Sequence, residues 1–282
     1  MIKLATSIDI NKFSISLSLS DKVMVLGSCF ADEMGSRMAA AGFDVCVNPF
    51  GTLYNPVSIA NSIARMSHGV EFRADECVEM GAGAGEVCSW WHHTSFARST
   101  AEEFLDNANK SLVEASAFWK GCNKVIVTLG TAMVWKLVSS GEVVSNCLKR
   151  PSREFSHELL GVDQVSAVLR RMVAAHPDKD FIFTVSPIRH LGDGAHANSL
   201  SKSTLLLGLE ALQHAAYFPA YEIMLDELRD YRYYAEDLVH PSKTAIEIIW
   251  QRFLQAAVPD EQLPAIAENE KRFRASQHRP LR

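Results

Sequence analysis

Short apolar runs alternate with longer segments of helical periodicity along most of this chain of 282 residues. The apolar runs predict buried strands over 23–26, 43–47, 124–129, 181–185 and, more weakly, 216–218. Apolar residues at helical spacing predict helices over 31–41, 57–66, 162–173, 200–214 and 242–257. Strands that alternate with helices are typical of a parallel sheet covered on both faces. We therefore expect an α/β protein, built as a three-layer α/β/α sandwich around a mainly parallel sheet.

The chain shows no internal repeat and no low-complexity linker, which indicates a single domain over 1–282. We expect its core at about 20–257 and a peripheral C-terminal tail over 258–282, whose basic residues are typical of a solvated end. A hairpin is predicted around 139–141, and 191–198 is expected to be a mobile loop near the site. The glycine-rich stretch 80–85 predicts a surface turn, since the helix and the Lys-Ser/Thr pair of a phosphate-binding loop do not follow it.

Composition excludes several classes of protein. The formal net charge of -5 is too mild to indicate a nucleic-acid or membrane surface. No apolar run reaches the length of a transmembrane helix, and Asp9, Asn11 and Lys12 interrupt the N-terminal segment where a signal peptide needs an unbroken apolar run. We therefore expect a cytoplasmic protein. The six cysteines form no CxxC pair and no Cys/His cluster with zinc spacing, which predicts reduced thiols and neither a metal site nor a cofactor.

Candidate catalytic residues stand at the ends of predicted elements. Ser28 follows the first strand and opens a helix, while Asp237 and His240 stand three positions apart before the last helix. Ser, Asp and His in this order are the parts of a nucleophilic hydrolase, in which the carboxylate orients the imidazole and the imidazole accepts the proton of the hydroxyl. Each residue also has a simpler explanation: Ser28 as a helix N-cap, Asp237 as a capping residue and His240 as a surface residue.

Further residues gather at the same edge, because the carboxyl ends of parallel strands lie side by side. Cys29 is a second candidate nucleophile, since a thiol at a helix N-terminus can have a lowered pKa. His93, in the aromatic cluster 90–96, could line a substrate pocket or belong to the core. Arg189 and His190 follow the strand at 181–185 and could contact an anionic or polar substrate, or cap nearby carbonyl groups.

The segment Gly27-Ser28-Cys29-Phe30-Ala31, followed by Asn48-Pro49-Phe50-Gly51-Thr52-Leu53-Tyr54-Asn55-Pro56, resembles the bacterial GSCFA family. The resemblance extends over about 23–257 and includes the segments 127–132, 186–190 and 237–241. The family is grouped with the SGNH (GDSL-like) esterase and lipase superfamily. Membership implies an SGNH-hydrolase-like domain with flavodoxin-like topology.

The superfamily pattern implies roles for individual positions. Ser28 matches the nucleophile and one oxyanion N–H donor, Gly51 matches a second donor, and Asp237 and His240 complete the triad. The chain departs from the pattern at Gly130-Thr131-Ala132, where the superfamily has a Gly-x-Asn-Asp motif that supplies an asparagine donor. The hydroxyl of Thr131 could replace that donor, or the side chains of Asn48, Asn55 or Asn146 could reach the site from loops. Loss of one such donor costs about 10²–10³ in rate.

These observations predict a serine esterase, or acyl-ester hydrolase, that acts on a small-molecule or glycan ester such as an acetylated carbohydrate. Two alternatives use the same fold: an acyltransferase with the same triad, and a ligand- or carbohydrate-binding module without catalysis. The sequence identifies neither the acyl group nor the alcohol of the substrate, and it leaves the oligomeric state open.

Overall fold

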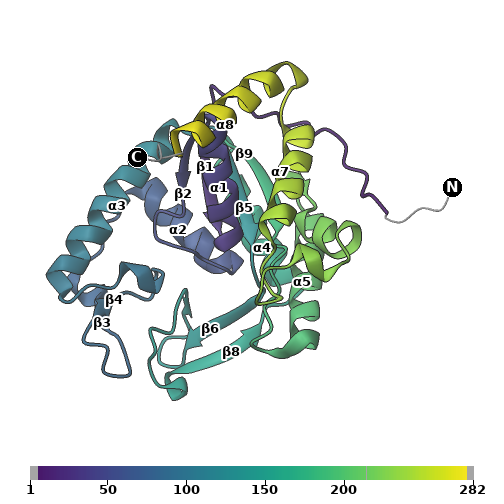
Figure 1. Ribbon diagram of the computed structural model, residues 1–282. Coiled ribbons are helices and arrows are strands. Elements are labelled where there is room, and N and C mark those ends of the chain that lie inside the picture. Colours follow the sequence, from purple (N-terminus) through teal and green to yellow (C-terminus); the bar gives the residue numbers. More distant parts are fainter. Residues whose placement is uncertain (1–5, 214, 278–282) are drawn as a thin grey trace, which may run out of the picture.

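The computed structural model describes residues 6–213 and 215–277 (Figure 1). Its central sheet has five strands, all parallel: β1 (Lys22–Gly27), β2 (Asp44–Val47), β5 (Lys124–Leu129), β9 (Asp180–Val185) and β10 (Ala216–Phe218). Their spatial order is β10-β9-β5-β1-β2. Numbered by position along the chain, this is the 2-1-3-4-5 order of flavodoxin-like folds. The predicted α/β class and topology are confirmed.

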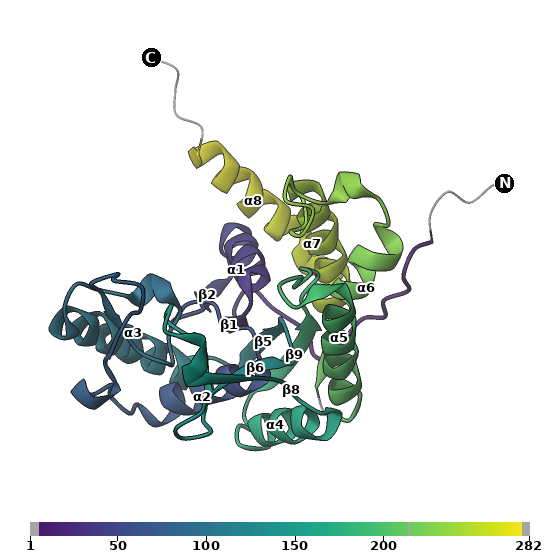
Figure 2. The same ribbon diagram turned by 90° about the horizontal axis from the view of Figure 1, so that it is seen from below.

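Helices cover both faces of this sheet (Figure 2). One face carries α1 (Cys29–Ala41), α7 (Lys243–Ala257) and α8 (Leu263–Gln277), and the other carries α2 (Pro56–His68), α3 (Ala101–Gly121), α4 (Val162–Ala174) and α5 (Gly194–Glu210). Strand β1 shows how the layers form, because alternate side chains of a strand point to opposite faces. Val23 and Val25 pack with α1 and α7, whereas Met24 and Leu26 pack with α2, α3 and α4. The predicted three-layer sandwich is therefore confirmed.

Smaller elements extend from the carboxyl edge of the sheet. Strand β6 (Met133–Leu137) follows β5 directly and pairs antiparallel with β7 (Val143–Val144) and β8 (Phe155–Leu159). The predicted hairpin around 139–141 is the β6–β7 connection. A second small ladder joins β3 (Val78–Glu79) to β4 (Val87–Cys88). The remaining helical turns are Ala74–Glu76, Thr94–Phe96, Ser152–Glu154, α6 (Ala220–Glu222), Ile223–Glu227, Tyr231–Tyr233 and Asp260–Gln262.

Several elements differ from expectation. Helix α3 was not predicted. Its buried face mixes three large residues, Phe104, Leu112 and Trp119, with three small ones, Ala108, Ala115 and Ser116. Helix α5 already begins at Gly194, so most of the expected mobile loop 191–198 is helical. That helix ends at Glu210, and His214, where the prediction ended, lies outside the described residues.

The predicted limits of the core were too narrow. Helix α8 lies within the expected tail, yet its Ile266 is 1% exposed and the Nδ2 group of Asn269 donates to Ala41 O at 2.9 Å. Before the first strand, Leu17 is fully buried and its N–H donates to Ala257 O at 2.7 Å. Both ends of the described chain therefore pack on the α1–α7 face. The last part of the expected tail, 278–282, lies outside the described residues.

None of the described helices is both long and apolar enough to cross a bilayer. All six cysteines are free thiols. Within 6–213 and 215–277, no group of three or more His, Cys, Asp or Glu side chains is arranged to hold a metal ion.

Candidate active site

The candidate site lies where β1 passes into α1. Strand β1 is flanked by β2 on one side and β5 on the other, so the chain leaves the sheet at the point where the strand order reverses. Ligands of such sheets bind in the crevice at this point. Gly27 makes the tight transition possible: its φ is +132°, and a Cβ atom there would lie 2.1 Å from Thr128 O.

Ser28 does not face the histidine of the predicted triad. Its side chain is 2% exposed, and its Oγ atom lies 3.2 Å from Thr128 Oγ1. The same oxygen accepts a hydrogen bond from Phe30 N at 3.3 Å, so Ser28 is the N-cap of α1. Among the described residues, no hydrogen bond joins Ser28 to His240. This geometry does not fit the predicted role of Ser28 as nucleophile, because the helix and β5 hold its hydroxyl inward.

Cys29, the next residue, faces His240 instead. Its Sγ atom lies 3.7 Å from Nε2 of His240, and Nδ1 of the same ring lies 2.6 Å from Oδ2 of Asp237. An N-cap side chain folds back over the first turn, whereas the following side chain projects outward from the helix end. The structure therefore brings Asp237 and His240 together as predicted, but against a thiol.

The turn that carries Asp237 and His240 is held by its own backbone. Oδ1 of Asp237 accepts hydrogen bonds from the N–H groups of Val239 and His240, both at 2.9 Å. These bonds, with the one to the His240 ring, lower the pKa of Asp237 to about 2. Leu238 between them has a φ of +56°, a left-handed conformation. Asp237 is thus both a turn cap and the acceptor that orients His240, so the two interpretations of this residue are compatible.

The Cys29 thiol is held in its neutral form. Burial raises its pKa above the ordinary value of 9.0, and the carboxylates of Asp32 and Glu33 act in the same direction. The N–H groups of Cys29 and Phe30 lower this pKa but do not overcome burial. Such a thiol needs a general base at the moment of attack, and Nε2 of His240 is the ring nitrogen that faces it.

The three predicted oxyanion donors already have partners inside the protein. Ser28 N donates to Thr128 O at 3.1 Å, and Gly51 N donates to Asn48 O at 2.8 Å. Thr131 N donates to Tyr54 O at 3.0 Å, and the Thr131 hydroxyl lies 2.9 Å from Ser201 Oγ. None of the three is free to hold an oxyanion in this conformation. The N–H of Cys29 is the better donor, since it opens α1 and no carbonyl within the helix can accept it.

Four residues predicted to reach the site from loops have structural roles instead. Asn48 joins the β1–α1 turn to α1: its Oδ1 accepts from Gly27 N at 2.8 Å, and its Nδ2 donates to Asp32 Oδ1 at 2.7 Å. Asn55 is the N-cap of α2. His93 packs against Gly51, and its Nδ1 accepts from Ser95 N at 3.2 Å. Asn146 holds a turn through Leu148 N at 2.7 Å, and no described contact joins it to the triad.

Arg189 and His190, predicted to contact substrate, lie on the loop after β9. The Nη2 group of Arg189 lies 3.5 Å from Leu238 O, within the Asp237–His240 turn. His190 is exposed, and its Nδ1 atom lies 3.7 Å from Asp193 Oδ2. Arg189 thus adjoins the Asp237–His240 turn, whereas His190 points toward the start of α5.

Lys202 of α5 is a buried cation that sequence reasoning missed. Its Nζ donates to Gly130 O at 2.7 Å and Ser186 O at 2.8 Å, at the ends of β5 and β9. Burial lowers its pKa to about 7. A lysine among polar residues of a helix carries no sequence signal for burial, so only the packing of α5 on the sheet reveals it.

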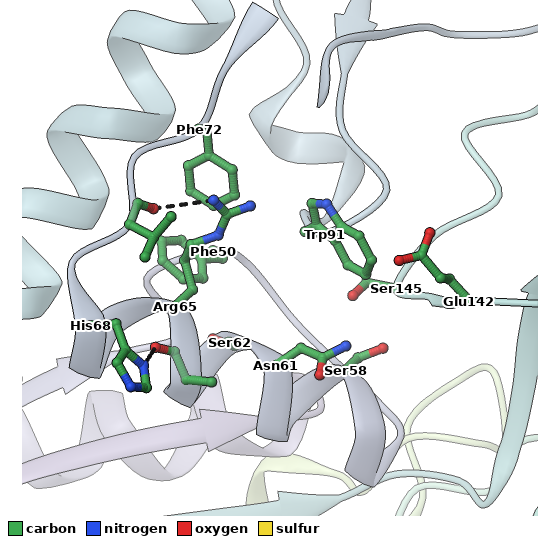
Figure 3. Close-up of a pocket in the computed structure, with 12 residues that line it drawn as sticks. Phe50, Ser58, Asn61, Ser62, Arg65, His68, Phe72, Trp91, Glu142 and Ser145 are labelled. Atoms are coloured by element: carbon green, nitrogen blue, oxygen red, sulfur yellow. Dashed lines mark hydrogen bonds between the residues drawn. The ribbon is translucent and has the colours of Figure 1, made fainter. Parts of the chain in front are cut away.

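A separate cavity of about 430 Å³ lies between α2 and the segments around Phe72, Trp91 and Glu142 (Figure 3). Its lining residues are Phe50, Ser58, Asn61, Ser62, Ala64, Arg65, His68, Val70, Phe72, Trp91, Glu142 and Ser145. Cys29, His240 and Asp237 are not among them. One lining residue, Phe50, directly precedes Gly51, which was predicted as an oxyanion donor.

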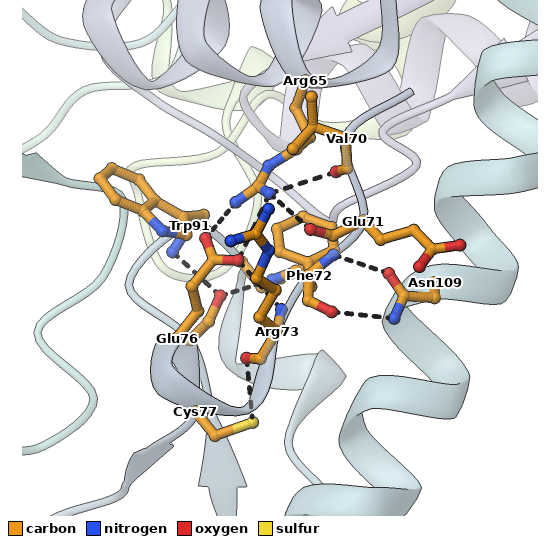
Figure 4. Close-up of polar contacts among 11 residues, drawn as sticks. Arg65, Val70, Glu71, Phe72, Arg73, Glu76, Cys77, Trp91 and Asn109 are labelled. Carbon is orange, nitrogen blue, oxygen red and sulfur yellow. Dashed lines mark hydrogen bonds and ion pairs between the residues drawn. The ribbon is translucent and has the colours of Figure 1, made fainter. Parts of the chain in front are cut away.

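The wall of this cavity is held by Arg65 (Figure 4). Its guanidinium pairs with Glu76, donates to Val70 O at 3.1 Å and Glu71 O at 3.0 Å, and lies 4.0 Å from the centre of the Phe72 ring. Asn109 of α3 holds Phe72 through both its backbone groups. The cavity is therefore a preformed space, while the candidate catalytic residues lie outside it, around the end of β1.

Comparison with known proteins gives one result. Searches of curated proteins and of solved structures find no match to the chain. A model of the GSCFA family matches residues 22–253, which include the β1–α1 turn and the Asp237–His240 turn. Since this range covers most of the chain, the protein belongs to the GSCFA family.

Proposed function

We propose that the protein is an acyl-ester hydrolase that uses Cys29 as nucleophile, His240 as general base and Asp237 as the residue that orients His240. The observation that carries the proposal is the chain of contacts from Sγ to Nε2, 3.7 Å, and from Nδ1 to Oδ2, 2.6 Å. Asp237 accepts a hydrogen bond from Nδ1–H of His240, so the lone pair of Nε2 faces the thiol. The same arrangement would suit an SGNH-like enzyme in which Cys29 takes the place of the serine.

The proposed reaction has two halves. The Cys29 sulfur attacks the ester carbonyl carbon while Nε2 of His240 accepts the thiol proton. The Cys29 N–H and the positive end of α1 stabilise the oxyanion. The tetrahedral intermediate expels the alcohol, which takes the proton from His240, and leaves a thioester on Cys29. Water then attacks the thioester with His240 again as base, and the released thiolate recovers the proton.

Hydrolysis is preferred to acyl transfer because the site is open to water. The side chains of Asp237 and His240 are 50% and 47% exposed. An acyltransferase has to keep water from its acyl-enzyme, and a half-exposed base favours attack by water. The proposed substrate remains a small-molecule or glycan ester.

The test is intact-mass spectrometry and turnover with a short-chain 4-nitrophenyl ester. Wild type should form a thioester adduct and release carboxylate. Cys29→Ala should lose the adduct, and Cys29→Ala and His240→Ala should each lower kcat/KM by at least about a thousandfold. Asp237→Asn should lower it about a hundredfold or more, because the ring loses its preferred tautomer.

Ser28→Ala is the matched control for the neighbouring hydroxyl. It should keep the adduct and lose about 1 kcal/mol of stability, since it removes the N-cap of α1 together with the contact to Thr128 Oγ1. An adduct that survives Cys29→Ala and disappears with Ser28→Ala would return the role to the serine. Ligand-induced stabilisation without any adduct or turnover would instead indicate a binding module.

A further inference from the structure

The guanidinium group of Arg189 forms no ion pair with an acidic side chain of residues 6–213 and 215–277. Six other arginines form ion pairs with carboxylates: Arg37, Arg65, Arg150, Arg232, Arg252 and Arg272. Arg189 is half-buried, and within the described chain no carboxylate lies at ion-pair distance from it. Its Nε atom is buried and has no hydrogen-bond partner there. A half-buried arginine with unused donors is costly unless a ligand completes it.

Three acidic side chains at the carboxyl edge of the sheet are already engaged. Asp237 is bound to the His240 ring, and Asp32 accepts from Asn48 Nδ2 at 2.7 Å. The carboxylate of Glu222 accepts from the Tyr217 hydroxyl at 2.8 and 2.9 Å. None of them can neutralise Arg189 without giving up these bonds. The charge is therefore available to a group from outside the protein.

The position of Arg189 connects this charge to the catalytic turn. Within the described residues its side chain donates one hydrogen bond, to Leu238 O at 3.5 Å. This bond is weak, and Leu238 lies between Asp237 and His240. The guanidinium carbon lies 5.5 Å from the centre of the Tyr234 ring, which limits how the guanidinium can turn. The remaining donors thus lie next to the turn that carries His240.

We propose that Arg189 is a specificity-determining residue that binds a carboxylate group of the substrate. This inference rests on the proposed function, because the ester to be cleaved must lie at Cys29. A single guanidinium suits one planar monoanion, which it can hold by two parallel N–H···O bonds. Lys202 cannot assist, since it is fully buried and donates to two backbone carbonyls. The preferred substrates are esters that carry a carboxylate near the scissile bond.

The first experiment compares two alkylating reagents of similar size, iodoacetate and iodoacetamide, in their reaction with Cys29. Wild type, Arg189→Lys and Arg189→Met are compared by mass spectrometry of the Cys29 peptide. The ratio of the iodoacetate rate to the iodoacetamide rate should fall about fivefold or more in Arg189→Met, since a cation next to the Asp237–His240 turn attracts the anionic reagent. In Arg189→Lys this ratio should lie between the values for wild type and Arg189→Met. Arg170→Met, on an exposed position of α4, should leave it unchanged.

The second readout uses 4-nitrophenyl hydrogen glutarate and its neutral methyl ester. Arg189→Met should raise KM for the anionic ester at least about fivefold and leave KM for the neutral ester unchanged. If Arg189→Met lowers the alkylation rates with both reagents equally, and impairs turnover of both esters equally, Arg189 only positions the Leu238 turn. This result would overturn the inference about Arg189 but not the proposed function. A Cys29 that resists both reagents, with turnover that survives Cys29→Ala, would overturn the proposed function as well.

Discussion

At the scale of single residues, the chemistry of the site depends on the neutrality of the Cys29 thiol. A cysteine at a helix N-terminus often has a lowered pKa, and this expectation made Cys29 a candidate in the sequence. In the structure the pKa of Cys29 is raised instead, because burial and the nearby Asp32 and Glu33 outweigh the lowering effect of the N–H groups of Cys29 and Phe30. Position at a helix end therefore does not determine the charge of the thiol.

This direction predicts the pH dependence of Cys29 alkylation. The thiolate is the reacting form, and a pKa raised above 9.0 keeps its fraction small at neutral pH. The rate with iodoacetamide should therefore keep rising from pH 7 to beyond pH 9, about tenfold per pH unit, without a plateau near neutrality. The alkylation rate measured with Cys29→Ala gives the contribution of the other five thiols, which is subtracted. A plateau between pH 6 and 8 would indicate a thiolate–imidazolium pair and contradict the prediction.

At the scale of elements, α8 is part of the fold. The Nε1 group of Trp250 in α7 donates to Glu270 at 2.7 Å, and Asn269 fits against Gly42 so closely that a Cβ there would lie 2.4 Å from Asn269 Nδ2. These contacts tie α8 to α7 and to the end of α1. Because α1 begins with Cys29, α8 supports the helix that carries the proposed nucleophile.

Ile266→Ala tests this role of α8. The side chain is 1% exposed, so its truncation should cost about 2–4 kcal/mol of unfolding free energy. Phe273→Ala is the control in the same helix, since Phe273 is 46% exposed and should change stability by less than about 0.5 kcal/mol. Urea unfolding measures both. If both substitutions lower the unfolding free energy equally little, α8 is the peripheral tail that its sequence suggested.

Elements with a continuous apolar run could be predicted from the sequence. Helices α3 and α8, which lack an evident apolar pattern, were not predicted. The runs at 23–26, 124–129 and 181–185 correspond to strands buried on both faces, and this fixes a parallel sheet. Helix α8 has one buried side chain, Ile266, and its contact with α1 and α7 explains why that side chain is buried. At the site, Asp237 and His240 were predicted together, because their spacing lies within one turn. The choice between Ser28 and Cys29 depends on which adjacent side chain caps α1, and that orientation is set by Thr128, a hundred residues away.

At the scale of the whole molecule, Lys202 joins three elements that are far apart in the sequence. It extends from α5 to carbonyl groups at the ends of β5 and β9, and its ammonium lies 5.5 Å from the centre of the Tyr221 ring. No described carboxylate pairs with it. A charge buried in this way disfavours its own protonated form, which is why its pKa falls from 10.5 to about 7.

The lowered pKa makes global stability depend on pH. Between pH 7 and 10.5 the unfolded chain binds more protons at this lysine than the folded protein, so the contribution of Lys202 to stability rises with pH, by up to about 1.4 kcal/mol per unit. Urea unfolding at pH 7, 8 and 9 should show wild type gaining stability relative to Lys202→Met. Lys179→Met is the control, because Lys179 also donates to two backbone carbonyls but lies 3.2 Å from Asp178. Parallel pH curves for wild type and Lys202→Met would show that the lysine stays charged when folded, and that the carbonyl groups of Gly130 and Ser186 compensate for its burial.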